Sequence, residues 1–254
     1  MKKLQELPLE FKKLKKPPTD IFYEGNLELL SKPKVAIVGS RKILNYTRTL
    51  VHELASKLSR AGIVVVSGAA LGVDAAAHRA AVPNTIAVLP TSLDVIYPKT
   101  NKEIIEQMFN TSLVLSEYEK GTQINKYSFV ERNRLVTALS DAVIIAQADE
   151  NSGSMHSAHW ALEQGKELFV LPHRLSESSG TNALLANGDA ELINNIDRFV
   201  ERYGIFSEES EDALIKWCSQ NPDYEEAYRR FGEQLLEYEL DGKIAIENAQ
   251  VIVL

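Results

Sequence analysis

A short buried strand that ends at a turn of small residues is the strongest chemical feature of the sequence. Residues 35–38 are consecutive apolar residues, as in a strand buried on both faces of a parallel sheet. Gly39 and Ser40 end this run, and helical periodicity begins at Tyr46. A strand-to-helix turn leaves free backbone N–H groups at the positive end of the helix dipole, and Arg41 adds a planar cation that matches a phosphate. We therefore expect an anion site here; the alternative is a plain tight turn with a solvated arginine.

This turn lacks the glycines of the common nucleotide motifs. The residues after Gly39 run Ser-Arg-Lys-Ile-Leu, so the G-x-G-x-x-G fingerprint of dinucleotide sites is missing. No G-x-x-x-x-G-K-[ST] sequence occurs in the chain either. The turn is expected to face phosphate without being an NAD site or a P-loop.

The densest polar stretch, residues 125–134, combines cations with aromatic rings. Basic groups interleaved with aromatic residues are typical of single-stranded nucleic acid sites, because charge follows the backbone while unstacked bases lie on rings. The alternative is a core phenylalanine and arginines in surface salt bridges. The candidate residues here are Lys126, Phe129, Arg132, Asn133 and Arg134.

Motifs for catalysis or metal binding are weak. Asp74 and His78 lie four residues apart on a predicted helix, but no third ligand accompanies them, so a helix-terminal carboxylate and a packed histidine are the simpler interpretation. No G-x-S-x-G elbow is present, and the lone Cys218 can form neither an intrachain disulfide nor a cysteine zinc cage. We expect no catalytic residues, no metal and no cofactor.

Apolar strands alternate with helical periodicity through most of the chain, which predicts parallel βαβ units in a mostly parallel, doubly wound α/β sheet of the Rossmann type. The strands are expected at 35–38, 63–66, 85–89, 113–115, 142–146 and 168–171, and the helices near 46–61, 73–81, 101–109, 128–139, 155–164 and 181–187.

Three of the predicted strands end in Gly/Ser turns. Ligands of such sheets bind beyond the carboxyl ends of the strands, so these turns should share one edge. Together they predict a broad, amide-rich cleft for several phosphates. The turns are Gly39-Ser40, Ser67-Gly68 and Ser152-Gly153-Ser154.

Charge is distributed unevenly along the chain. Of the net charge of −7, residues 201–254 carry −8, from 13 acidic and 5 basic residues, so the main body is nearly neutral and can hold a local basic pocket. No apolar run is long enough to span a bilayer, and the lysine-rich start has no apolar core of a signal peptide. These features favour a cytoplasmic protein without a membrane segment.

The chain is expected to have three parts. Residues 1–33 form a basic lead-in segment, and residues 34–205 form the Rossmann-like domain. Residues 207–254 predict three short helices and a terminal hairpin, the element order of a small winged-helix module.

Eight short motifs follow one another between residue 34 and about residue 200. They are V-A-I-V-G-S-R at 35–41, S-G-A-A-L-G-V-D-A-A-A-H-R at 67–79, Y-P-K-T-N at 97–101, S-E-Y at 116–118, R-N-R-L-V-T-A-L-S-D at 132–141, S-G-S at 152–154, A-L-E-Q-G-K-E at 161–167 and G-T-N-A-L-L-A-N-G at 180–188. No single motif is specific, but the ordered set is, and it resembles that of the DNA-processing protein A (DprA/Smf) family.

The resemblance implies a non-catalytic, dimeric protein that binds incoming single-stranded DNA in bacterial natural transformation and loads the recombinase RecA. It places DNA contacts on Gly39, Ser40 and Arg41, on Lys126, Phe129, Arg132, Asn133 and Arg134, and on Ser152, Gly153 and Ser154. The chain departs from the family pattern after Gly121, where prolines are missing, and at residues 155–159, where histidines replace aliphatic residues.

Two other functions stay open. Rossmann-like nucleotide phosphoribohydrolases of the lysine-decarboxylase-like group also hold a phosphate at glycine-rich turns, but their P-G-G-x-G-T-x-x-E motif is replaced here by Asn-Ser-Gly-Ser-Met at 151–155. A non-catalytic scaffold that binds a protein partner and keeps a vestigial cleft is the third possibility.

Overall fold

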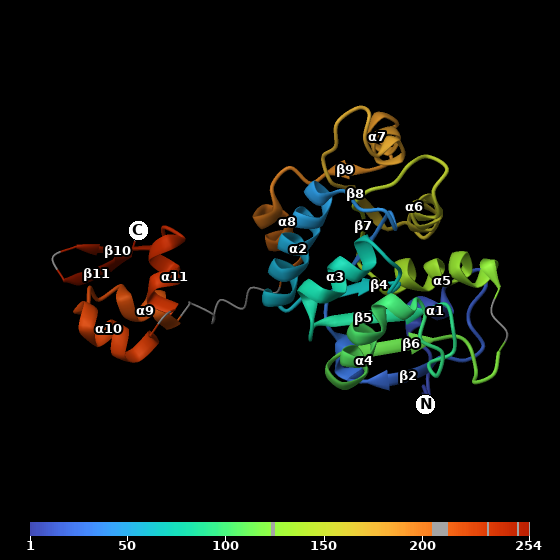
Figure 1. The fold of residues 1–254 in the computed structure, drawn as a ribbon, viewed down its shortest axis with the longest axis horizontal. Helices are drawn as coiled ribbons and strands as arrows, with labels where there is room; N and C mark the ends of the chain where they lie inside the picture. The colour runs from blue at the N-terminus through green and yellow to red at the C-terminus, as the bar shows by residue number, and fades with distance from the viewer. Residues whose placement is uncertain (123–124, 205–212, 233, 248, 254) are drawn as a thin grey trace. The chain divides into compact units, whose positions relative to one another are not determined.

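The computed structural model describes residues 1–122, 125–204, 213–232, 234–247 and 249–253. The chain divides into two compact units, residues 1–205 and residues 206–254. The first unit is a layered α/β domain, and the second is a small bundle of helices with a hairpin (Figure 1).

One nine-stranded sheet forms the centre of the first unit, and its strand order is β1-β2-β6-β5-β4-β3-β7-β8-β9. From β6 to β9 neighbouring strands are parallel, whereas β1 and β2 pair antiparallel at one edge. The mostly parallel Rossmann-like sheet predicted from the sequence is therefore confirmed. The strands are β1 (Lys2–Lys3), β2 (Phe22–Gly25), β3 (Lys34–Val38), β4 (Val64–Ser67), β5 (Thr85–Leu89), β6 (Leu113–Ser116), β7 (Ala142–Ile145), β8 (Glu167–Val170) and β9 (Glu191–Leu192).

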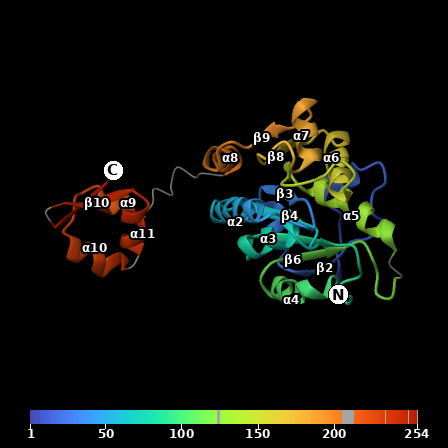
Figure 2. The ribbon, with the colours of Figure 1, turned by 45° about the horizontal axis from the view of Figure 1, so that its top comes forward.

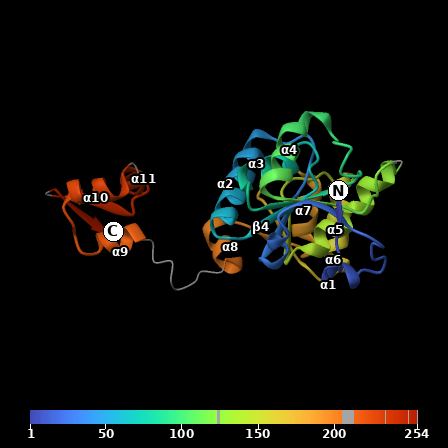
Figure 3. The same ribbon diagram turned by 90° about the horizontal axis from the view of Figure 1, so that it is seen from below.

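Helices cover both faces of the sheet. Figure 3 shows α2, α3 and α4 on one face and α1, α5 and α6 on the other. The helices of this unit are α1 (Leu9–Lys12), α2 (Asn45–Arg60), α3 (Val73–Ala81), α4 (Lys102–Thr111), α5 (Lys126–Leu139), α6 (Gly153–Glu163), α7 (Ser179–Ala186) and α8 (Ile196–Tyr203), with short 3₁₀ turns at Leu27–Ser31 and Lys99–Asn101.

Alternating side chains of the central strand explain why it is apolar throughout. In β3, Val35 and Ile37 pack into the core under α2 and α3, whereas Ala36 and Val38 pack into the core under α5 and α6. Successive residues of a strand point to opposite faces, so a strand covered on both sides needs an apolar residue at every position.

The strand order contains a switch point between β3 and β7. The chain runs outward from β3 through β4 and β5 to β6, then returns to place β7 on the other side of β3. The loops that leave β3 and β7 therefore turn to opposite faces of the sheet and leave a crevice between them. This crevice positions the candidate site.

The two ends of the first unit differ from the sequence-based outline. The predicted lead-in segment supplies β1 and β2 to the sheet, and β2 pairs with β6 through residues 22–25. At the other end, β9 and α8 extend the fold beyond the last predicted helix. Phe199 and Val200 of α8 are buried in the same core as α2.

The second unit has helices α9 (Ala213–Cys218), α10 (Tyr224–Phe231) and α11 (Gln234–Leu240), followed by the antiparallel strands β10 (Ile244–Glu247) and β11 (Gln250–Val253). This is the element order expected for residues 207–254; residues 205–212 and Leu254 lie outside the described residues. Its core consists of Leu214, Cys218, Ala227, Leu235, Ile244 and Val251.

None of the helices in the described parts of the chain combines the length and the apolar composition that a membrane span needs.

Candidate functional site

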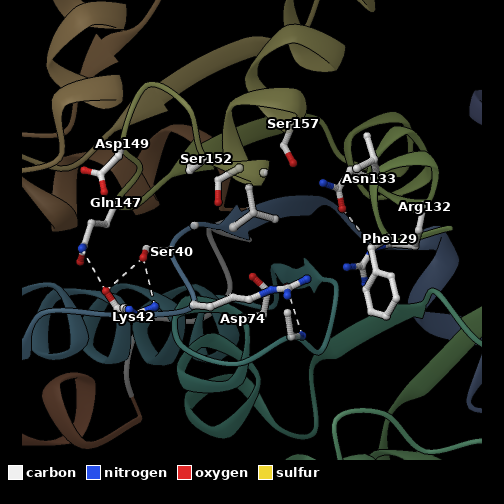
Figure 4. A pocket seen from close by; sticks show the side chains of 17 residues that line it. Ser40, Lys42, Asp74, Phe129, Arg132, Asn133, Gln147, Asp149, Ser152 and Ser157 are labelled. Carbon is white, nitrogen blue, oxygen red and sulfur yellow. Dashed lines mark hydrogen bonds between the residues drawn. The ribbon is translucent and has the colours of Figure 1, made fainter. Parts of the chain in front are cut away.

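A pocket of about 450 Å³ opens at the switch point, and we call it the switch-point pocket. Figure 4 shows Ser40 and Lys42 on one side of it, Ser152 and Ser157 across from them, and Phe129, Arg132 and Asn133 at one end. Its lining comes from the loop after β3, the turn after β4, the first turns of α5, and the loop between β7 and α6. The lining residues are Val38, Gly39, Ser40, Arg41, Lys42, Ala70, Asp74, Phe129, Val130, Arg132, Asn133, Gln147, Asp149, Ser152, Gly153, Ser154 and Ser157.

Gly39 lets three segments meet at the floor of this pocket. A Cβ atom on Gly39 would lie 2.8 Å from the Val73 Cγ2 and 2.9 Å from the Gln147 carbonyl oxygen, closer than real Cβ contacts. The Ser40 N–H donates to the Gln147 carbonyl at 2.7 Å, and the Val73 N–H donates to the Ser40 carbonyl at 3.1 Å. The small residue after β3 is thus required by the close packing of the loops after β3, β4 and β7.

The backbone amides of the loop after β3 are mostly engaged within the protein. Besides the Ser40 N–H, the Lys42 N–H donates to the Ser40 hydroxyl at 3.1 Å, and the Leu44 N–H donates to the Gln147 side-chain oxygen at 3.0 Å. The expectation of free amides at this turn is wrong for these three groups, because each already has an acceptor within the protein. The helix α2 itself begins only at Asn45, after this loop. What the turn offers an anion is the charge of Arg41 and Lys42, both of which are exposed.

The start of α6 supplies the free donors instead. The first N–H groups of a helix have no intrahelical acceptor, and α6 begins at Gly153 in the wall of the pocket. The Ser152 side chain makes no capping bond, and its buried hydroxyl oxygen has no hydrogen-bond partner within the described structure. These groups, together with the positive end of the helix dipole, give this terminus the donors and the partial charge that suit an anion.

The turn after β4 is closed by a carboxylate. Asp74 is buried, and its Oδ2 accepts from the Gly68 and Ala70 N–H groups at 3.2 and 3.3 Å. Those amides are therefore unavailable to a ligand, and the expectation that all three Gly/Ser turns present free amides is wrong for the one at Ser67-Gly68.

Arg132 is buried beneath the pocket and binds the sheet. Its guanidinium donates to the carbonyl oxygens of Gly68 and Val88, at the ends of β4 and β5, and its Nε donates to the Asn133 side-chain oxygen at 3.1 Å. Only 4% of Arg132 is exposed. A Cβ on Gly68 would overlap the guanidinium, at 2.2 Å from its Nη1. Arg132 therefore joins α5 to the strand ends, with one side toward the pocket.

Burial changes the protonation chemistry around Arg132. It lowers the pKa of the Arg132 guanidinium to about 10, which leaves the group charged at neutral pH, and the nearby Asp74 carboxylate opposes part of this shift. Burial raises the pKa of Asp74, against the pull of Arg132. His78, one helical turn from Asp74, is fully buried, and burial together with Arg132 lowers its pKa to about 3.

Phe129 is placed by the cap of α5. The Asn125 side-chain oxygen accepts from the N–H groups of Tyr127 and Ser128 at 2.8 and 3.2 Å, which fixes the helix start one turn before the ring. The Phe129 ring lies 5.6 Å from the Arg41 guanidinium carbon and 5.3 Å from the Tyr97 ring, which meets it edge-on. A cation and two aromatic rings therefore meet at one end of the pocket.

The structure brings most of the predicted site residues together. The loop after β3, the start of α6, and Phe129, Arg132 and Asn133 of α5 all line the switch-point pocket. Arg134 does not line it: its guanidinium is buried and paired with the Glu117 carboxylate at 2.6 Å. Lys126 is the first residue of α5, and its side chain lies outside the described residues.

Four further residues of this region escaped the sequence analysis. Lys42 follows Arg41 directly, and Gln147 follows a predicted strand, so both occupy positions that the strand-end rule marks. Tyr97 lies in the Y-P-K-T-N motif, to which no role was given. Asp149 is an exposed carboxylate in the pocket lining, and no sequence motif indicated its position there.

The part of the chain that the structure describes contains no cluster of three or more His, Cys, Asp or Glu side chains that could hold a metal ion. The simpler interpretation of Asp74 and His78 is confirmed: the carboxylate closes a turn, and the His78 Nδ1 lies 2.7 Å from the Thr85 hydroxyl.

Residues 2–204 match the family model described as DNA recombination-mediator protein A. This chain belongs to that family. DNA processing protein DprA of Streptococcus pneumoniae is 40% identical over 193 residues, which make up 74% of this chain and 68% of the relative. The protein of the same name from Bacillus subtilis is 35% identical over 203 residues, or 78% of this chain and 68% of the relative.

Solved structures agree with the family and the fold. DNA processing protein A from Helicobacter pylori, studied for its single-stranded DNA binding mode, superposes with a TM-score of 0.77 at 49% identity, covering 79% of this chain and 94% of that one. The Streptococcus pneumoniae structure superposes with a TM-score of 0.73 at 39% identity, covering 78% of this chain and 71% of that one. The predicted family and fold class are confirmed.

Proposed function

We propose that this chain is a single-stranded DNA-binding recombination mediator and that the switch-point pocket is its DNA site. One observation carries the proposal: the pocket combines exposed cations, an open helix N-terminus and a partly exposed phenylalanine within one concave surface. Single strands are bound by this combination, because the cations and amides hold phosphates while the ring stacks on an unpaired base.

Two walls of the pocket supply the phosphate contacts. Arg41 and Lys42 neutralise backbone charge from the loop after β3. Across from them, a phosphate oxygen at the start of α6 accepts from the Gly153 and Ser154 N–H groups and from the Ser152 hydroxyl, which has no hydrogen-bond partner among the described residues. Two facing walls can therefore hold consecutive phosphates of one strand.

Phe129 supplies the contact with a base. Its ring is partly exposed and is held between Arg41 and Tyr97, so it is already ordered before DNA arrives. Arg132 acts as a positioning residue, because its guanidinium is bound to the Gly68 and Val88 carbonyls. The Asn133 side-chain oxygen accepts from Arg132, which leaves its amide nitrogen to donate into the pocket.

Membership of the family suggests a role for the protein beyond DNA binding. We propose that the protein forms a homodimer, protects incoming single strands in natural transformation and loads the RecA recombinase onto them. Membership of the DNA recombination-mediator protein A family supports this role, as does the single-stranded DNA binding of the Helicobacter pylori relative.

A comparison of strand forms tests the proposal. Fluorescence anisotropy with a labelled thymine oligonucleotide and with the matching duplex should give tighter binding of the single strand, because a paired base cannot lie on Phe129. Phe129→Leu should weaken single-strand binding and leave the weak duplex binding unchanged. Equal affinity of wild type for both forms, together with no effect of Phe129→Leu on either, would contradict the proposal.

A further inference from the structure

A second concave surface adjoins the switch-point pocket on the outer face of two helices. A groove of about 510 Å³ runs along α2 and α3, and we call it the α2–α3 groove. Figure 2 shows the two helices side by side on one face of the sheet. Arg41 and Lys42 line both the groove and the pocket, so the two surfaces are continuous. The remaining lining residues are Ile43, Arg48, His52, Leu71, Gly72, Ala75, Ala76, Arg79 and Asn101.

Small residues keep the groove open. Ala75 and Ala76 of α3 are only partly buried and form part of the lining. Gly72, before them, packs directly on the loop after β3, because a Cβ there would lie 2.2 Å from the Ser40 carbonyl oxygen. Arg48 and His52 stand one turn apart on α2 and therefore share a face, and Arg79 is exposed on α3.

Three exposed cations of this groove stand without an ion-pair partner among the residues that the structure describes. Lys42, Arg48 and Arg79 are exposed, and within the described ranges none of them forms an ion pair. Farther along α2, by contrast, Lys57 pairs with Glu53 at 3.0 Å and with Asp197 at 2.6 Å.

No Asp or Glu stands among the lining residues. A concave surface with one sign of charge concentrates counter-ions and attracts a polyanion.

We propose that the α2–α3 groove holds the phosphodiester backbone of the same single strand after it leaves the switch-point pocket. This inference rests on the proposed function. No Phe, Tyr or Trp lines the groove, so it offers phosphate contacts without a stacking platform. Arg48 and Arg79 suit this task because a guanidinium fork matches a phosphate in two places. The groove therefore lengthens the strand path and binds it independently of base sequence.

Binding of a short and of a long oligonucleotide distinguishes the contribution of the pocket from that of the groove. Single-strand sites of OB folds span about 4 to 16 nucleotides, so we compare a thymine oligonucleotide of about 4 nucleotides, expected to engage mainly the pocket, with one of about 15 nucleotides, expected to reach the groove as well. The variant Arg48→Gln/Arg79→Gln should bind the short strand like wild type. It should bind the long strand at least about fivefold more weakly at 0.15 M salt, with a salt dependence flatter by about 1.4 log units per log unit of salt, for two lost phosphate contacts.

Two controls make the result interpretable. Arg60→Gln/Arg198→Gln removes the same charge from exposed arginines that line neither surface, and should bind both strands like wild type. Arg41→Gln should weaken both strands. If Arg41→Gln weakens both strands while Arg48→Gln/Arg79→Gln matches the control on both, the groove inference is wrong and the proposed function stands.

Other outcomes are also decisive. Equal weakening of the short and long strands by Arg48→Gln/Arg79→Gln would contradict an extended path beyond the pocket. If Arg41→Gln proves as mild as the control, the pocket is not the DNA site and the proposed function fails. The single variants Arg48→Gln and Arg79→Gln, each expected to flatten the salt dependence for the long strand by about 0.7 log units, serve if the double variant unfolds.

Discussion

The guanidinium carbon of Arg41 lies 5.6 Å from the ring centroid of Phe129, although one residue follows β3 and the other belongs to α5. Their meeting joins a phosphate-binding group to a base-stacking surface. In a single strand, each nucleotide presents a phosphate and an unpaired base close together, so neighbouring protein groups of these two kinds can hold one nucleotide at both ends.

Removal of the Asp149 carboxylate should strengthen DNA binding. Asp149 is exposed in the lining of the switch-point pocket, where a negative charge repels a nearby phosphate. Asp149→Asn keeps the shape and removes the charge, and we expect affinity to rise about twofold at 0.15 M salt, the size of a screened surface interaction. Anisotropy titrations measure it, with Glu150→Asn as the control for general charge. An affinity of Asp149→Asn equal to that of the Glu150 control would show that the strand does not pass this wall.

Arg134 should matter for stability and not for DNA. Its buried guanidinium is paired with Glu117 at 2.6 Å and does not line the pocket. Arg134→Met leaves the partly buried Glu117 carboxylate without its partner, so we expect a loss of about 3 kcal/mol in the free energy of unfolding, measured by urea denaturation.

DNA affinity of folded Arg134→Met should match wild type, and its salt dependence should be unchanged. A slope flatter by about 0.7 would instead make Arg134 a phosphate contact.

His78 should make the protein less stable in acid. Its pKa is lowered to about 3 by burial and by Arg132, so the folded protein keeps His78 neutral while the unfolded chain takes up a proton below about pH 6.5. The unfolded state then binds more protons, and stability falls as pH falls through this window. By linkage, His78 alone removes about 2 kcal/mol between pH 7 and pH 5.

The measurement is the free energy of unfolding of wild type and of His78→Gln at both pH values. Carboxylates titrate in both proteins, so the difference between the two slopes isolates His78. Because the Thr85 hydroxyl donates to the Val65 carbonyl at 2.7 Å, His78 Nδ1 is the donor to Thr85, which glutamine can replace. Parallel pH profiles would show that His78 is protonated inside the folded protein.

The sheet and the main site could be predicted because they follow from local pattern. Apolar runs such as residues 35–38 and 85–89 specify buried strands, and the strand-end rule then brings Gly39, Ser40 and Arg41 to the same edge as Ser152–Ser154. The spacing of Ile196, Phe199, Val200 and Tyr203 is also that of a helix face, so the sequence contains the signal for α8 as well.

What escaped prediction depends on long-range partners. Arg132 and Arg134 are two residues apart on one helix and point to different sides, so one reaches the strand ends and the other reaches Glu117. The sequence alone does not distinguish the roles of these two arginines. Likewise, the Gln147 side chain accepts from the Leu44 N–H although the two residues are 103 positions apart in the sequence, which no local pattern of the turn reveals.

The salt dependence of single-strand affinity separates phosphate contacts from base stacking in the switch-point pocket. Wild type, Arg41→Gln, Phe129→Ala and the distant control Arg60→Gln are titrated with a thymine oligonucleotide from low to moderate salt. We predict that Arg41→Gln weakens binding and flattens the slope by about 0.7 log units, for one lost phosphate contact. Phe129→Ala should lose about 1–3 kcal/mol of binding free energy with the slope unchanged, because stacking releases no counter-ions. Slopes and affinities of both variants equal to those of Arg60→Gln would contradict the assignment of the switch-point pocket as the DNA site.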